Sequence, residues 1–187
     1  MRTTHPFLLA VCTLLIAALA GTHVWAAQAS SPPIGSAAPD FTTYNYVTGE
    51  KTRLSDQHGK VVILTFWATW CAPCREELPN LEGIQEHVGK DQLVVLAVNY
   101  RDSDETISYL RKNAKKAAWK ISMLLDPNGG IAVKYGIDSI PHLFLIGRDG
   151  NIVAAHSGFG DGSIDTMLPE INAALAGKPA SAATSRE

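Results

Sequence analysis

The chain has 187 residues, a net charge of −2 and a hydrophobic content of 46%. This length suffices for one domain with a real core, and the composition is ordinary for a globular protein. Nothing in so small a net charge suggests a nucleic-acid partner, and none is expected.

Residues 1–26 have the three parts of a secretory signal. Arg2 supplies a positive charge, residues 7–20 are apolar apart from Cys12 and Thr13, and small residues precede Ala27. The apolar run is shorter than the roughly 20 residues that span a bilayer. We therefore expect a cleaved signal peptide, with an uncleaved membrane anchor as the alternative. Both place the rest of the chain in the periplasm or another extracytoplasmic space.

Three predicted elements follow. Residues 27–38 are rich in Ala, Ser, Pro and Gly, which predicts a linker. Residues 41–47 and 52–54 are predicted strands that form a β-hairpin. Residues 61–67 are a continuous, largely β-branched apolar run, the pattern of a strand covered on both faces.

A Cys-x-x-Cys pair, Cys71 and Cys74, lies between that strand and a predicted helix over 75–88. Unpaired N–H groups and the macrodipole at a helix start favour an anion. Such sites lower a thiol pKa from about 8.5 to about 3.5–7.5. The second sulfur is near enough to close a disulfide and expel whatever the first has bound. The pair therefore indicates a redox-active dithiol that needs no further cofactor.

The pair has two other interpretations. Zinc needs two more ligands, but the only other cysteine is Cys12, and the histidines beyond the signal are scattered: His58, His87, His142 and His156. No metal is therefore expected. A purely structural disulfide is the second alternative, although so short a loop gives little entropic stabilisation.

Strands and helices alternate along the rest of the chain. Strands are predicted over 93–98, 121–125, 143–146 and 152–156, and helices over about 103–113, 131–135 and 163–176. Asp102 is expected to cap its helix in a capping box with Glu105. Residues 177–187 are small and polar, which predicts a disordered tail. This order of elements predicts an α/β sandwich with a mixed sheet.

Several segments resemble one family. Residues 66–79, FWATWCAPCREELP, resemble the active-site segment of the TlpA/ResA-like branch of the thioredoxin superfamily. Ser139-Ile140-Pro141 resembles the cis-proline loop of that fold, and residues 38–41 resemble the entry to the branch's extra N-terminal β-hairpin. The resemblance implies a thioredoxin-like fold over residues 39–176, with a mixed sheet of four or five strands flanked by helices.

The resemblance also implies roles for residues near the dithiol. Cys71 becomes the attacking thiolate and Cys74 the resolving thiol. Thioredoxin carries a buried aspartate six residues before its first cysteine, where this chain has Thr65, which cannot accept a proton at neutral pH. Glu77, a helical neighbour of Cys74, is the substitute candidate. The alternative is a solvated glutamate that merely favours the helix dipole.

The expected substrate groove comprises Trp70, Ile140, Pro141, His142 and Gly158. Trp70 either shields the site or lies in the core. Pro141 is expected to follow a cis bond, with the preceding backbone free to pair with an extended substrate. His142 either tunes the thiolate or is a solvent-facing strand residue. Gly158 forms a third rim of the groove or an ordinary turn.

These features together predict an exported thiol–disulfide oxidoreductase, with a reductase favoured and a monomer expected. The resemblance implies cysteine-containing exported proteins such as apocytochrome c as clients, and a membrane electron donor. The alternatives are a disulfide-forming oxidase or isomerase, a copper(I) metallochaperone and a peroxiredoxin-like peroxidase. The Pro-x-x-x-Thr/Ser-x-x-Cys pattern of peroxiredoxins is absent, because Leu64 and Trp67 occupy the two proline positions.

Overall fold

The structure is a computed structural model that describes residues 30–177, without the side chains of 114–117. The predicted signal segment 1–26 and residues 178–187 of the predicted tail lie outside the described residues. Within residues 30–177, no helix has the length and apolar character needed to cross a bilayer.

A five-stranded mixed sheet with the order β5-β4-β3-β6-β7 forms the centre of the molecule. Its strands are β3 (Val61–Trp67), β4 (Leu93–Asn99), β5 (Ser122–Leu125), β6 (His142–Ile146) and β7 (Ile152–Ser157). The first three are parallel, and β6 runs antiparallel to β3 and β7. All seven residues of the central strand β3 are buried, as its continuous apolar run predicts.

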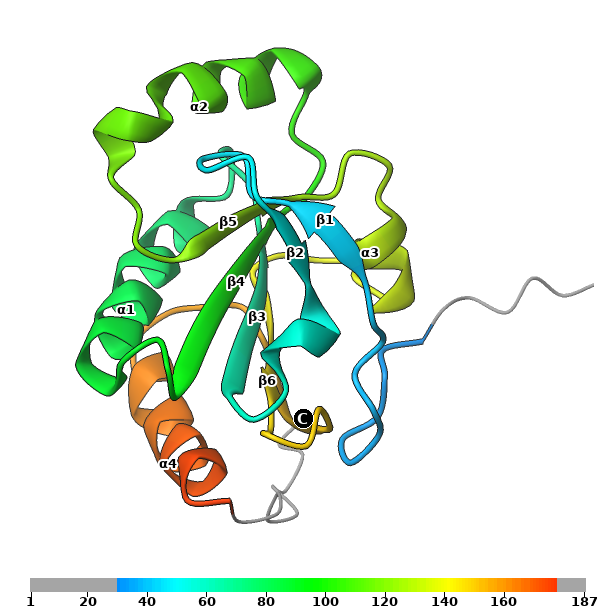
Figure 1. The fold of residues 1–187 in the computed structure, drawn as a ribbon, viewed down its shortest axis with the longest axis vertical. Helices are drawn as coiled ribbons and strands as arrows, with labels where there is room; N and C mark the ends of the chain where they lie inside the picture. The colour runs from blue at the N-terminus through cyan, green and yellow to red at the C-terminus, as the bar shows by residue number, and fades with distance from the viewer. Residues whose placement is uncertain (1–29, 178–187) are drawn as a thin grey trace, which may run out of the picture.

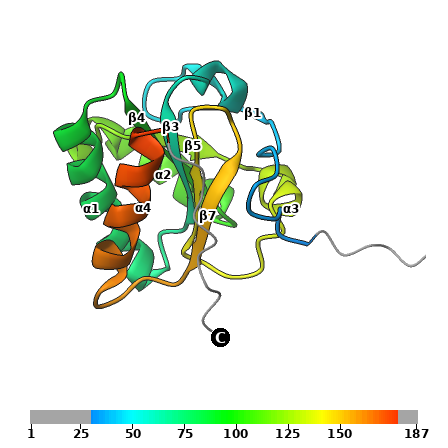
Figure 2. The same cartoon turned by 90° about the horizontal axis from the view of Figure 1, so that it is seen from below.

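Helices cover both faces of the sheet (Figures 1 and 2). On one face, α1 (Ala72–Val88), α2 (Asp104–Ala117) and α4 (Ser163–Leu175) pack on a hydrophobic cluster that contains Ile63 of β3. On the other face, α3 (Gly130–Lys134) packs on a second cluster that contains Phe66 and Phe144. The alternation of side chains along β3 therefore supplies both cores.

The predicted N-terminal hairpin is confirmed as a separate two-stranded antiparallel sheet of β1 (Thr42–Tyr44) and β2 (Lys51–Arg53). β1 is shorter than predicted because the Asn45 side-chain oxygen accepts bonds from the backbone N–H groups of Val47 and Thr48, which turns the chain. The segment after β1 crosses the sheet edge, where the backbone N–H of Tyr46 donates to the Met123 carbonyl at 2.9 Å. Tyr46 thereby joins the cluster that contains both cysteines.

Part of the predicted linker lies along β7. The N–H of Gly35 donates to the Ile152 carbonyl at 2.7 Å, the N–H of Ile152 donates to the Ser36 carbonyl at 2.9 Å, and Ala37 pairs with Asn151. An edge strand presents unpaired backbone groups. Residues 35–38 satisfy them at this edge, although their composition is that of a linker.

Helix α2 starts later than predicted. Ser103 lies at its start, where its hydroxyl accepts a bond from the N–H of Thr106 at 3.2 Å. The prediction that Asp102 caps this helix is wrong. The Asp102 carboxylate instead accepts bonds from Thr69 and Asn99, so a tertiary contact replaces the local cap.

Candidate active site

The two cysteines lie where β3 leads into α1, at the carboxyl end of the central strand. They form a disulfide with a Cα–Cα distance of 5.3 Å. Cys71 is the N-cap residue of α1, and its sulfur accepts a bond from the N–H of Cys74 at 3.2 Å. The first sulfur is therefore at the helix start, in the position expected to stabilise a thiolate.

The two sulfurs differ in access to the surface. Cys71 is 5% exposed and Cys74 is fully buried. Cys74 belongs to the buried face of α1 with Glu77, Leu78 and Leu81. A large partner can therefore reach the pair only from the Cys71 side.

Glu77 is buried rather than solvated, with 2% of its surface exposed. Its Oε2 accepts a bond from the Thr65 hydroxyl at 2.7 Å. Burial raises the pKa of Glu77 to about 7, and the Thr65 bond partly opposes that rise. The alternative of a solvated charge at the helix start is excluded, while the catalytic role of Glu77 remains a prediction.

A set of polar contacts that the sequence did not predict, here called the Thr69 clamp, holds the turn before Cys71. The Asp102 carboxylate accepts bonds from the Thr69 N–H at 3.0 Å, the Thr69 hydroxyl at 2.8 Å and the Asn99 amide at 2.7 Å. The Arg75 guanidinium donates to the Thr69 carbonyl at 2.7 Å. Both backbone polar groups of Thr69 are thereby fixed two residues before the reactive sulfur.

The Ile140–Pro141 peptide bond is cis, as the resemblance implies. The carbonyl of Pro141 accepts a bond from the N–H of Gly158 at 2.9 Å, which ties the two expected rims of the groove together. Gly158 has a φ of +78°, a conformation that favours glycine. Ile140 is half-buried and packs against both hydrophobic clusters.

His142 is half-buried, which excludes the alternative that it is a solvent-facing strand residue. Its ring stacks on Phe144 with centroids 4.9 Å apart, and its Nδ1 lies 3.0 Å from the Ser157 hydroxyl. Burial lowers the pKa of His142; Asp138 opposes this effect and His156 adds to it. A lowered pKa leaves the imidazole neutral at pH 7.

Trp70 is 60% exposed, which excludes a place in the core. It directly precedes Cys71 in the chain, and its indole is at the surface. Exposed aromatic side chains of this kind are enriched where proteins bind partners.

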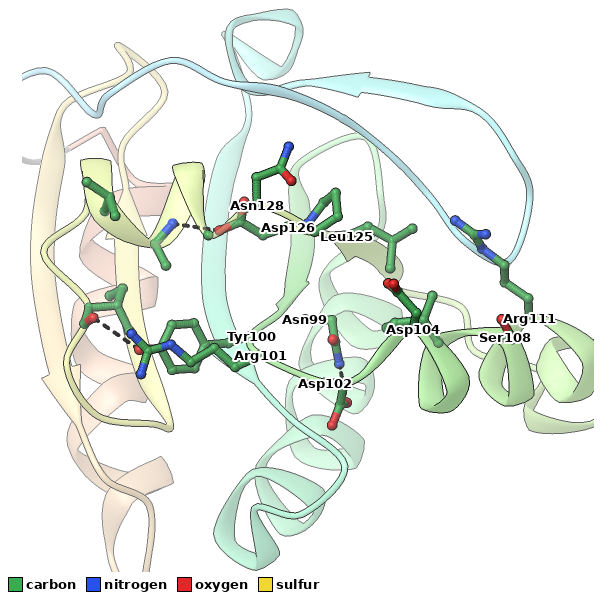
Figure 3. Close-up of a pocket in the computed structure, with 16 residues that line it drawn as sticks. Asn99, Tyr100, Arg101, Asp102, Asp104, Ser108, Arg111, Leu125, Asp126 and Asn128 are labelled. Atoms are coloured by element: carbon green, nitrogen blue, oxygen red, sulfur yellow. Dashed lines mark hydrogen bonds between the residues drawn. The ribbon is translucent and has the colours of Figure 1, made fainter.

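A cavity of about 470 Å³ lies beyond the Thr69 clamp, at the carboxyl ends of β4 and β5 (Figure 3). Asn99 and Asp102 of the clamp line it, and Arg101 and Arg111 stand on opposite sides of it. The Arg101 guanidinium lies 4.8 Å from the centre of the Tyr100 ring. The sequence did not predict this cavity, because its walls come from separate segments between residues 99 and 137.

The described residues contain no cluster of three or more His, Cys, Asp or Glu side chains suited to a metal ion. The chemistry that the arrangement supports is thiol–disulfide exchange. The outer sulfur lies at a helix start, where a thiolate is favoured once the disulfide is reduced, and the inner sulfur lies three residues further along the same helix. A carboxyl with a pKa of about 7 lies on the buried face of that helix.

Comparison with known proteins agrees with this chemistry. Residues 34–155 match the model of the AhpC/TSA family. The thioredoxin-like protein YneN of Bacillus subtilis (strain 168) is 37% identical over 124 residues, 66% of this chain and 71% of the relative. The thiol-disulfide oxidoreductase ResA of Geobacillus thermodenitrificans (strain NG80-2) is 30% identical over 145 residues, 76% of this chain and 81% of the relative.

A solved structure extends the similarity to three dimensions. The crystal structure of a Chlorobium tepidum protein, named as a thiol:disulfide interchange protein DsbE, matches with a TM-score of 0.68 and 32% identity. The match covers 78% of this chain and 99% of that one. The chain therefore belongs to the AhpC/TSA family and is a ResA-like thiol–disulfide oxidoreductase with a thioredoxin-like fold.

Proposed function

We propose that this oxidoreductase is exported and reduces disulfide bonds in other exported proteins. The observation that carries the proposal is the asymmetry of the pair. Cys71 reaches the surface at a helix start, whereas Cys74 is fully buried on the same helix face as Glu77. This arrangement suits a two-step exchange in which the outer sulfur attacks and the inner sulfur resolves.

In the first step, the reduced protein attacks a client disulfide through the Cys71 thiolate. A bond forms between Cys71 and one client sulfur, and the other client sulfur leaves as a thiolate that takes a proton from water. In the second step, the Cys74 thiol passes its proton to the Glu77 carboxylate and attacks Cys71. The Cys71–Cys74 disulfide forms, and the second client sulfur leaves as a thiolate that takes a proton from water, while Glu77 returns its proton to water before the next cycle. The client gains two electrons and two protons, and this protein, which enters with Cys71 as a thiolate, loses two electrons and the Cys74 proton.

The expected groove supplies a place for the client chain. We expect the backbone of Ile140, the residue before Pro141, to pair with an extended client segment. Trp70 is exposed next to Cys71 in the chain, and the N–H of Gly158 donates to the Pro141 carbonyl, so both are available to line such a path. The clients are cysteine-containing exported proteins, and apocytochrome c is the candidate that the family resemblance suggests.

The N-terminal sequence supports an extracytoplasmic setting, because residues 1–26 have the pattern of a secretory signal. A reductase in an oxidising compartment must be recharged after each turnover. We propose that a membrane electron donor of the dithiol class supplies the two electrons by exchange with the Cys71–Cys74 disulfide. The protein acts as a monomer.

Equilibration in glutathione redox buffers tests the direction of the reaction. A reductase requires a potential near or below that of thioredoxin, about −270 mV, whereas oxidases and isomerases lie at about −120 to −180 mV. A potential in the upper range would overturn the reductase and favour the oxidase or isomerase alternative. Rapid consumption of peroxide, or stoichiometric tight uptake of copper(I) by the reduced protein, would instead favour the peroxidase or the metallochaperone.

A further inference from the structure

We propose that Thr65 is a positioning residue that holds the Glu77 carboxyl in place and keeps it available to take the Cys74 proton. The inference rests on the proposed part of Glu77 in the second exchange step. It assigns a role to the residue that stands where thioredoxin has its buried aspartate.

The geometry places one hydroxyl beneath the Glu77 carboxyl. Thr65 lies inside β3, in register with Ala97 of β4 and Leu143 of β6, and is fully buried. Every other residue of β3 is apolar. The Thr65 Oγ1 donates to the Glu77 Oε2 at 2.7 Å. Among the described residues, no other group donates a hydrogen bond to that carboxyl. Either group would cost free energy if it were buried without a partner, so the hydrogen bond between them stabilises the folded protein.

A hydroxyl suits a carboxyl that must change its protonation state. It donates to the ionised carboxylate, and it can accept from the protonated acid by turning its own hydrogen away. The Glu77 side chain can therefore keep one orientation before and after it takes the Cys74 proton. A valine at position 65 would have nearly the same shape but could serve neither state.

The other titratable groups of the neighbouring elements make no hydrogen bond to the Glu77 carboxyl within residues 30–177. His156 of β7 pairs with Leu143 of β6, and its Nε2 lies 2.6 Å from the Oε2 of Glu170 in α4. Asp102 belongs to the Thr69 clamp together with Arg75 of α1. Tyr46 from the hairpin segment packs in the same cluster as the cysteines. Burial and the Thr65 bond are the influences on the pKa of Glu77, and of these two Thr65 favours the ionised form.

The test compares variants that lack or retain the hydroxyl. Thr65→Val and Thr65→Ala remove it, and Thr65→Ser keeps it as the matched control. Carbon-13 NMR of the oxidised protein reports the pKa of Glu77. We expect a rise of about one to two pH units in the first two variants, from the size of a hydrogen bond to a charged group. Thr65→Ser should remain near the wild-type value.

Kinetics supply the second readout. A mixed disulfide between Cys71 and a client peptide, mixed rapidly across a pH series, reports its resolution by Cys74. At pH 7, Thr65→Val and Thr65→Ala should resolve it about five- to fifty-fold more slowly, because a smaller fraction of Glu77 is ionised. Their pH profiles should move upward with the pKa of Glu77. In a Glu77→Gln background, removal of the hydroxyl should have no further effect on the rate.

The outcomes separate the inference from the function on which it rests. If the pKa of Glu77 keeps its wild-type value in folded Thr65→Val or Thr65→Ala, Thr65 does not have the proposed role. If that pKa rises while the resolution profile stays in place, the proton does not go to Glu77, and that step of the proposed function fails. Thr65→Ala leaves more space than Thr65→Val, so it keeps the test open if the valine variant does not fold.

Discussion

Glu77 couples the stability of the protein to pH. Its pKa is about 7 in the folded protein against an ordinary value of 4.5. Because the folded value is raised, the stabilisation of the neutral carboxyl is fully present below about pH 4.5 and is lost as pH rises through 7. The shift corresponds to about 3 kcal/mol at 1.36 kcal/mol per pH unit.

Chemical denaturation of the oxidised protein between pH 4 and pH 9 measures this coupling. Glu77→Gln cannot ionise, so its free energy of unfolding should lack the decline that the wild type shows between about pH 4.5 and 7. Glu76→Gln, one position away and exposed, is the matched control and should decline like the wild type. Parallel curves for Glu77→Gln and the wild type would contradict a buried, neutral Glu77.

The two cysteines should differ in reactivity once the disulfide is reduced. Cys71 occupies the N-cap position and reaches the surface, whereas Cys74 is fully buried. At pH 6, iodoacetamide should therefore modify Cys71 much faster than Cys74, with an apparent pKa for Cys71 below about 8.5. Mass spectrometry of Cys71→Ser and Cys74→Ser assigns each rate. Equal rates and ordinary pKa values for both thiols would remove the basis for Cys71 as the nucleophile.

Single residues of the site were predictable where a local pattern or a family motif marked them. The Cys-x-x-Cys spacing identified Cys71 and Cys74, and the cis bond before Pro141 followed from the resemblance. The spacing of Glu77 from Cys74 placed it near the sulfur but left open whether it was solvated. Its burial depends on packing between α1 and β3, and helical spacing alone does not reveal such packing.

At the scale of elements, the Thr69 clamp joins the end of β3 to the end of β4. Asp102→Asn replaces a charged acceptor of three hydrogen bonds and places an amide beside the Asn99 amide. We expect a loss of about 1.5–3 kcal/mol in the free energy of unfolding, the range for hydrogen bonds to charged groups. Thr69→Val removes the hydroxyl bond alone and should lose about 0.5–1.5 kcal/mol.

Urea denaturation at pH 7 measures both losses. Asp104→Asn is the control, because Asp104 is exposed at the first position of α2 and its side chain makes no hydrogen bond within residues 30–177. Its stability should stay within about 0.5 kcal/mol of the wild type. If Asp102→Asn is as stable as Asp104→Asn, the clamp does not fasten the active-site turn.

Elements defined by a local sequence pattern were predicted with the right bounds, whereas elements that depend on contacts between distant residues were not. The strand at 61–67 was predicted with its observed bounds, because its continuous apolar run reflects burial on both faces. The start of α2 was predicted wrongly, because Asp102 binds Thr69, 33 positions earlier in the chain. Residues 35–38 were assigned to a linker, because composition does not reveal a free strand edge.

At the scale of the whole molecule, the alternation of strands and helices predicted the α/β class, and the resemblance supplied the topology. Strand order β5-β4-β3-β6-β7 places β3 at the centre. The carboxyl end of β3 therefore lies between the end of β4, next to which the clamp forms, and the start of β6, which Pro141 directly precedes. This placement brings residues 69–77, 102 and 140–142 to the same end of the central strands. The cavity at the neighbouring strand ends has no sequence signature, because no single segment forms it.

Capture of mixed disulfides in the exporting cell tests the central claim most directly. Cys74→Ser should accumulate covalent complexes between Cys71 and cysteine-containing exported proteins, because the resolving thiol is missing. Dithiothreitol should release them, Cys71→Ser should trap few, and mass spectrometry should identify the captured clients. If Cys74→Ser captures no exported protein while the wild type cycles between its oxidised and reduced forms in the same cell, client disulfide exchange through Cys71 is contradicted.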